Sequence, residues 1–231
     1  QEAYFCTVKE LDELGKNNIP RQLISHTHLI YSSPATLAFN SPGAEGFGVK
    51  RAGLAVPDSV MLIVSPGCCG RNTSVLSSMR AYQDRFYYLL MDETDIVTGR
   101  HLKKIPKAVA EICEGLKKKP SVVMICITCV DALLGTDMER VCHKAEEYAG
   151  VPVRPCYMYA LTREGRKPPM VHVRQSVYSL LEPKKKKGNV VNLLGYFSPL
   201  TDDCELYDLL HGAGVKTIHE ISRCKDYAQY Q

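Results

Sequence analysis

The 231-residue sequence contains no apolar run approaching the roughly 18 residues that a membrane-spanning helix needs, so we expect no membrane contact. It opens without a basic segment followed by an apolar core, so no signal peptide is visible. Neither sign of charge is in large excess over the other. The net charge is +4 and nearly vanishes when the run Lys184 to Lys187 is set aside, which gives no reason to expect nucleic acid as a partner.

The signatures of several common enzyme classes are absent as well. There is no GxxxxGKS or GxxxxGKT phosphate-binding loop, no GxGxxG dinucleotide fingerprint and no GxSxG nucleophile turn. The seven histidines show neither HExxH nor the spacing to cysteine pairs that is typical of zinc sites. We therefore assign no general acid, base or nucleophile in this sequence, and we do not expect structural zinc.

Hydrophobic residues make up 45% of the sequence and charged residues 23%, which excludes intrinsic disorder. Short apolar runs alternate with segments of helical periodicity, and this alternation predicts an α/β fold with a Rossmann-like, open and mostly parallel sheet flanked by helices. The predicted strands are 60–64, 86–91, 122–127, 151–154, 190–195 and 215–218. The predicted helices are 72–83, 101–117, 136–149, 171–182 and 202–211, the last with Thr201 as its N-cap.

The order of these segments predicts two domains. Residues 1–183 form the first, Rossmann-like domain, which opens with a polar lead-in over 1–30 and a turn-rich stretch over 31–58. A lysine-rich linker follows at 184–188. The alternation then restarts over 189–231, which we interpret as the start of a second, similar and incomplete domain.

Ten cysteines are an unusual number for a chain of this length, which is too long to be a disulfide-stapled secreted fold. We expect a reducing cytoplasm, where thiols bind metal, carry out redox chemistry or pack in the core. Cys68 and Cys69 follow the first predicted strand, and Cys129 follows the third. Ligands of open parallel sheets bind at the carboxyl ends of strands, so Cys69 and Cys129 are candidate metal ligands and Cys68 is a neighbouring candidate.

The other cysteines have less specific surroundings. Cys113 and Cys142 fall on apolar faces of predicted helices, and Cys126 falls within a predicted buried strand, so all three are expected to pack in the core. Cys156 at a strand end and Cys204 in a first helical turn have weaker claims to the site.

Several segments match a known family in the right order. They are VSPGCCG at 64–70, DIVTG at 95–99, Thr128-Cys129, LLGTD at 133–137 and GVPVR at 150–154. Together these segments resemble the first domain of nitrogenase component 1 proteins, and VVNLLGYFSPLTDD resembles the opening of that family's second domain. The resemblance covers roughly residues 39–220.

The resemblance implies that Cys69 and Cys129 help to bind an iron–sulfur cluster, either 4Fe-4S or a larger P-cluster-like one, between two component 1 subunits. A further cysteine of the family pattern is replaced here by Phe39. Because a four-iron cluster held by cysteine needs four thiolates, we expect two subunits, identical or merely similar, each to contribute Cys69 and Cys129. Cys68 is an additional ligand only if the cluster is larger.

Three functions stay open at this stage. The first is an electron-accepting oxidoreductase subunit of a nitrogenase-like reductase, supplied with electrons by an ATP-dependent iron–sulfur reductase that resembles the nitrogenase iron protein. The second is a non-catalytic scaffold on which a metal cluster of the nitrogenase cofactor type is assembled. The third is an α/β binding module whose cysteines only pack or sense redox state. We favour the first from the sequence.

Overall fold

The computed structural model describes residues 6–15, 17–18, 20, 48–67, 77, 80–157, 169–183, 188–195 and 197–231. Of residues 129, 132, 169 and 170 it describes the backbone alone. No helix in these ranges is long and apolar enough to cross a membrane.

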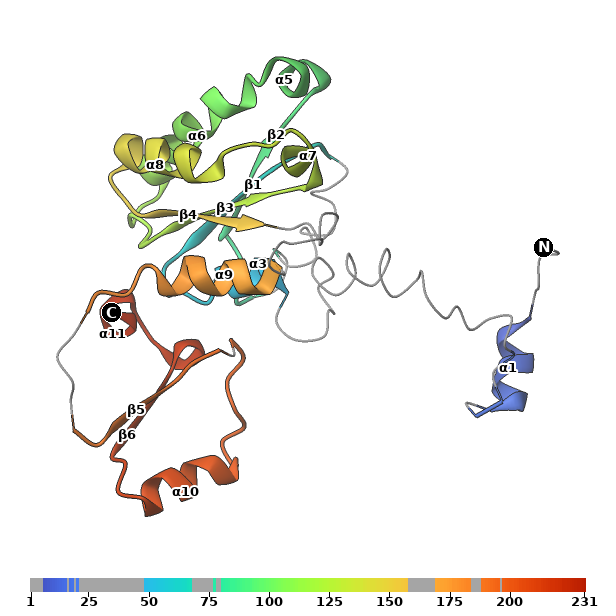
Figure 1. Ribbon diagram of the computed structural model, residues 1–231, viewed down its shortest axis with the longest axis vertical. Helices are drawn as coiled ribbons and strands as arrows, with labels where there is room; N and C mark the ends of the chain where they lie inside the picture. The colour runs from blue at the N-terminus through green and yellow to red at the C-terminus, as the bar shows by residue number, and fades with distance from the viewer. Residues whose placement is uncertain are drawn as a thin grey trace.

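A four-stranded parallel sheet forms the centre of the first part of the chain (Figure 1). Its strand order is β2-β1-β3-β4, with β1 at Val60–Ser65, β2 at Phe86–Leu90, β3 at Val123–Ile127 and β4 at Val153–Tyr157. All three strand pairs are parallel, which confirms the predicted Rossmann-like sheet. The two central strands are buried at every position, as their unbroken apolar runs predict.

Helices cover both faces of this sheet (Figure 1). Helices α6 (His101–Gly115) and α8 (Met138–Ala149) lie on one face, and α3 (Val49–Gly53) and α9 (Pro169–Tyr178) lie on the other. Because side chains alternate along a strand, β1 and β3 supply both cores. Leu62 and Ile125 belong to the cluster under α6 and α8, whereas Met61 and Met124 belong to the cluster under α3 and α9.

A second, two-stranded parallel sheet follows, built from β5 (Val190–Leu193) and β6 (Thr217–Glu220). Helix α10 (Glu205–Gly212) connects the two strands. The last helix, α11 (Tyr227–Tyr230), returns to α9, where the Tyr230 hydroxyl donates to the carbonyl oxygen of Val177. This separate sheet accords with the predicted restart of alternating strands and helices after residue 188. The domain boundaries stay a prediction, and residues 184–187 of the predicted linker lie outside the described residues.

Several element boundaries differ from the sequence-based expectations. The predicted strands 151–154 and 215–218 lie about two residues later, at β4 and β6. Helix α10 begins after Cys204 rather than after Thr201, because Thr201 uses its carbonyl oxygen to accept from Cys204 N in a turn. Most of the predicted helix 72–83 lies outside the described residues, and 80–84 form turns.

Five short α-helices within the described residues were not predicted, and three of them precede β3. Two begin with a capping box, in which the N-cap side chain and the third helical residue satisfy each other's backbone N–H groups. These are α1 (Val8–Leu14), which is capped by Thr7, and α5 (Glu93–Thr98), which is capped by Asp92. The third is α3, a single turn within the stretch expected to be irregular.

The outer edge of β4 is closed by side chains. Parallel pairing with β3 turns the backbone groups of Val153 and Pro155 away from the sheet. Val153 N donates to Glu146, the Val153 carbonyl accepts from Arg154, and Ser176 Oγ donates to the Pro155 carbonyl at 2.7 Å. Proline has no N–H to offer. These outward groups are therefore already used.

Arg85, which directly precedes β2, holds the turn between α3 and β1. Its Nη2 donates to the carbonyl oxygens of Leu54 and Val56 at 2.9 and 3.1 Å, and its Nε donates to the carbonyl oxygen of Ser59 at 2.9 Å. Burial lowers the pKa of the Arg85 guanidinium. One side chain thus bonds three backbone carbonyls of this turn, of which the Val56 carbonyl also accepts from Ser59 N at 3.3 Å.

Candidate functional site

The candidate metal-binding segments leave the sheet at neighbouring points. Strands β1 and β3 are adjacent, and the register pairs Val64 with Ile127 near their carboxyl ends. Cys129 is the first residue of α7 (Cys129–Leu133), two residues after β3 ends. This backbone position confirms that Cys129 lies between a strand and a helix at the ligand-binding edge of the sheet.

The complete ligand set stays a prediction. Cys68 and Cys69 follow the end of β1 by three and four residues and lie outside the described residues. Among the residues that the structure does describe, no three of His, Cys, Asp and Glu come together closely enough to hold a metal ion. Helix α7 has only five residues, so its dipole contributes little to stabilising a thiolate at Cys129.

Polar groups without partners lie at the same edge. Ser65 is the last residue of β1 and Thr128 directly follows β3, and the two residues are 0% and 2% exposed. Neither hydroxyl has a hydrogen-bond partner within the described part of the chain, and the same holds for Asp131 Oδ2. Because buried polar atoms are normally paired, this edge keeps donor capacity that a bound anionic group could use.

A buried histidine–aspartate pair includes Asp131, which lies two residues after Cys129 in the sequence. His101 Nε2 lies 2.9 Å from Asp131 Oδ1, and His101 Nδ1 lies 3.0 Å from the carbonyl oxygen of Asp95. A carbonyl oxygen only accepts, so Nδ1 carries a proton. The contact between Nε2 and the carboxylate joins His101 to Asp131. Sequence reasoning missed both residues, and the available signal was a charged residue two positions after Cys129.

Asp95 anchors the turn from which this pair is built. Its carboxylate, 1% exposed, accepts from Lys104 Nζ and from Arg100 Nε, each at 2.7 Å. The hydrogen bond from Lys104, followed by that from Arg100, holds the pKa of the Asp95 carboxyl well below its usual range. Asp95 also completes the capping box of α5 with Asp92. The carboxylate thus fixes the α5–α6 corner that presents His101.

We expect Asp95→Asn to lower the midpoint of thermal unfolding by several degrees at pH 7. A carboxyl whose folded-state pKa is depressed stabilises the fold above its unfolded pKa of about 4, and this contribution is lost as the pH falls toward the folded value. The difference from the wild-type protein should therefore be constant from pH 7 to about 5 and shrink below about 4. Thermal unfolding followed by circular dichroism measures it, with the exposed Glu114→Gln as control. A difference that grows on acidification would contradict this account.

Apolar side chains are exposed around the same end of the sheet. Leu133 in α7 is 75% exposed, and Leu134 after it is 48% exposed. Leu90 at the end of β2 and Val97 in α5 are 60% and 84% exposed. Exposed apolar side chains of this size, gathered at one end of a domain, are typical of protein contact surfaces.

The remaining described cysteines are free, and most are buried. Cys113, Cys126 and Cys142 pack in the two cores, as predicted, and Cys156 is also fully buried. Burial raises the pKa of Cys142 to about 12, so its thiol stays protonated. The structure therefore offers these thiols no route to a metal at the sheet edge.

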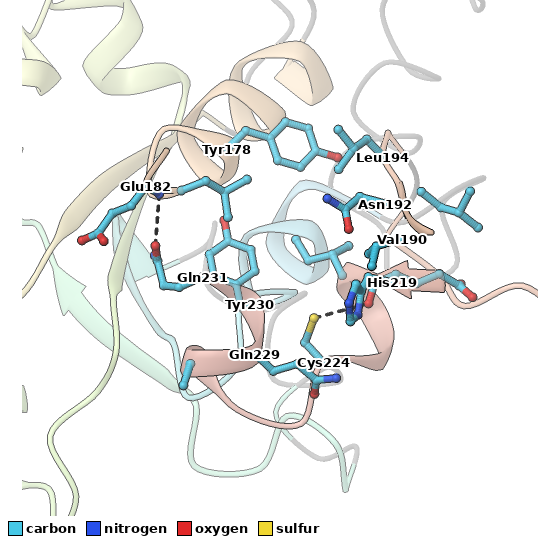
Figure 2. A pocket seen from close by; sticks show the side chains of 15 residues that line it. Tyr178, Glu182, Val190, Asn192, Leu194, His219, Cys224, Gln229, Tyr230 and Gln231 are labelled. Carbon is cyan, nitrogen blue, oxygen red and sulfur yellow. Dashed lines mark hydrogen bonds between the residues drawn. The ribbon is translucent and has the colours of Figure 1, made fainter. Parts of the chain in front are cut away.

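A cavity in the described part of the chain lies elsewhere, between α9 and the second sheet (Figure 2). It measures 930 Å³, and none of the predicted site cysteines lines it. Its polar lining is largely engaged. The Tyr178 hydroxyl accepts from Gly195 N, Cys224 Sγ donates to the Glu220 carbonyl, and Glu182 N donates to Gln231. We therefore place the candidate site at the ends of β1 and β3.

Comparison with known proteins yields a consistent group of relatives. The family model described as "Nitrogenase component 1 type Oxidoreductase" matches residues 45–229. The nitrogenase iron-molybdenum cofactor biosynthesis protein NifE of Rhizobium meliloti (strain 1021) is 28% identical over 176 residues, which cover 73% of this chain and 37% of that protein. NifE of Klebsiella pneumoniae is 26% identical over 211 residues, covering 82% and 46%. The chain thus spans less than half the length of these relatives.

Solved structures show the same fold. The structure "Nitrogenase Cp1 at pH 6.5" superposes with a TM-score of 0.57 at 21% identity, covering 84% of this chain and 40% of that one. The likeness confirms the α/β architecture described above.

Proposed function

Because the chain belongs to the nitrogenase component 1 type oxidoreductase family, we propose that it is a scaffold subunit on which a metal–sulfur cofactor is assembled. The observation that carries this proposal is the name shared by the relatives, which match most of the chain and are cofactor biosynthesis proteins. The sequence alone led us to favour electron relay. The relatives support the scaffold instead.

The two functions differ in the fate of the cluster and not in how it is held. Thiolates that relay electrons through a bound cluster are the same groups that would hold a cluster during assembly. Ligand residues at the ends of β1 and β3 therefore suit both. The support for the scaffold therefore comes from the relatives and not from the site itself.

The residues at the sheet edge fit an iron–sulfur group. Cys129 begins α7 beside the strand that leads to Cys68 and Cys69, and the Ser65 and Thr128 hydroxyls add buried donors. We assign Cys69 and Cys129 as ligands, with Cys68 as a further ligand of a cluster larger than 4Fe-4S. When bound, the group would hold inorganic iron and sulfide in a form that can be passed on.

A second subunit completes the ligand set in this proposal. One chain supplies two or three thiolates, whereas a four-iron cluster normally needs four. The exposed apolar side chains of α5, α7 and β2 surround the same end of the sheet and support a protein contact there. The partner is a second copy or a similar component 1 subunit. An ATP-dependent iron–sulfur reductase is the partner in the electron-relay alternative.

A transfer experiment tests the proposal. The full chain is purified anaerobically, reconstituted with ferrous iron and sulfide, and analysed for iron, sulfide and EPR signal. We expect the loaded protein to pass its cluster to a metal-free acceptor protein. Turnover with a nitrogenase-type reductase and ATP, without such transfer, would establish electron relay instead. Protein that stays colourless and iron-free after reconstitution would mean that the cysteines only pack or sense redox state.

A further inference from the structure

Helix α7, which carries Cys129, is too short to hold its own position. It has five residues, and a helix of that length does not form without outside contacts because nucleation is costly. The position of Cys129 therefore depends on what α7 is tied to. Within the described residues, its one buried charged side chain is Asp131, which is 0% exposed.

Asp131 is tied to α6 and to the turn after α7. His101, the first residue of α6, contacts Asp131 Oδ1 through Nε2 at 2.9 Å, and His101 is itself 1% exposed. Thr136 Oγ1 donates to the same oxygen at 3.0 Å, and Thr136 N donates to the Asp131 carbonyl at 3.1 Å. This turn passes through Gly135, whose φ of +65° few other residues adopt readily.

His101 is fixed in turn by the α5–α6 corner. Its Nδ1 donates to the Asp95 carbonyl at 3.0 Å, while Arg100 and Lys104 hold the Asp95 carboxylate. The two cations are thus engaged by Asp95, and within the described residues His101 and Thr136 bind the Asp131 carboxylate. A continuous set of hydrogen bonds runs from α5 through His101 to α7.

We propose that His101 is a positioning residue for Cys129: by binding Asp131 it holds α7 against α6 and so fixes the backbone from which the Cys129 thiolate reaches a cluster. The inference rests on the proposed function only in taking Cys129 as a ligand. Residues that orient a metal ligand from outside the ligand set typically change metal affinity by about 10- to 100-fold when replaced.

Two replacements separate the roles of the two ring nitrogens. The amide nitrogen of asparagine stands about where Nδ1 stands, so His101→Asn keeps the bond to Asp95 and loses Asp131. The amide nitrogen of glutamine stands about where Nε2 stands, so His101→Gln keeps the bond to Asp131. His143→Asn, on the exposed face of α8, is the matched control.

Two measurements are made on the full chain. The first is iron loss from the reconstituted protein to a ferrous chelator, together with the EPR spectrum. The second is amide hydrogen exchange of α7 in the metal-free protein. We expect His101→Asn to lose iron about tenfold faster with an altered EPR line shape, and α7 to exchange about tenfold faster while α8 is unchanged. His101→Gln and His143→Asn should stay within about twofold of wild type.

Two results would overturn the proposal. One is wild-type iron retention and α7 exchange in His101→Asn, and the other is equal loss in His101→Gln. If His101→Asn does not fold, Thr136→Val tests the same contact to Asp131. We expect about threefold faster iron loss from this variant, and iron loss at the wild-type rate would contradict the proposal. If the wild-type protein takes up no iron, the proposed function fails, and α7 exchange in the metal-free chain still tests whether His101 holds this helix.

Discussion

Replacing Cys129 with serine is expected to remove the bound iron almost completely. If two subunits each supply Cys69 and Cys129, the substitution deletes two of the four thiolates of one shared cluster, and serine is a poor substitute for a thiolate toward iron. We expect iron to fall from about four per dimer to less than about one, with loss of the visible absorption and EPR signals. Metal analysis after anaerobic reconstitution measures this.

A cysteine in the core provides the matched control. Cys113 lies on α6, is 8% exposed and packs between the helix and the sheet, so Cys113→Ala should keep its full iron content. Cys69→Ser should behave like Cys129→Ser, whereas Cys68→Ser should lose iron only if the cluster is larger than four irons. Unchanged iron in Cys129→Ser, with normal folding, would remove the ligand assignment.

Arg85→Met is expected to reduce the free energy of unfolding by about 3 kcal/mol. The guanidinium donates to the carbonyl oxygens of Leu54, Val56 and Ser59, and methionine keeps much of the volume but none of the donors. Buried acceptors that lose their partner cost about 1–3 kcal/mol each, and partial hydration of the turn recovers some of that loss. Urea unfolding of the full chain measures the change.

Two further arginine variants separate charge from geometry. Arg85→Lys keeps the positive charge but not the planar guanidinium with its several donors. It should therefore reduce the free energy of unfolding by about half or more of the reduction expected for Arg85→Met. Arg80→Met, at an exposed turn position, should change stability by less than about 0.5 kcal/mol. An Arg85→Lys variant as stable as the wild-type protein would mean that charge alone accounts for the role of Arg85.

The sequence predicts the centre of the sheet well because the two central strands, β1 and β3, are buried on both faces. The runs VMLIV and VMICI have no polar alternation, and this pattern is typical of central parallel strands. Helix α8 is equally well marked, since it ends at Gly150, whose φ of +61° glycine adopts readily. Strand β4 is less well predicted, because its sequence includes Pro155 and Arg154 and it lies at an edge.

The candidate site is only partly readable from the sequence. Cys129 stands out because a cysteine directly after a buried strand is an unusual and chemically meaningful combination. The pairing of His101 with Asp131 does not stand out, since 30 residues separate them and only the folded chain brings them to 2.9 Å. Short helices such as α5 and α7 are also hard to predict, because tertiary contacts rather than periodicity stabilise them.

The closed edge of β4 limits how the four-stranded sheet can join another copy of itself. Edge-to-edge growth into a filament requires two receptive borders, one to receive the preceding molecule and one to offer the next. Glu146, Arg154 and Ser176 already bond the outward backbone groups of Val153 and Pro155, so within the described residues β2 offers the more open border. Pairing through β2 would join two molecules about a two-fold axis, and the bonded groups of β4 would hinder the addition of a third molecule at the other border.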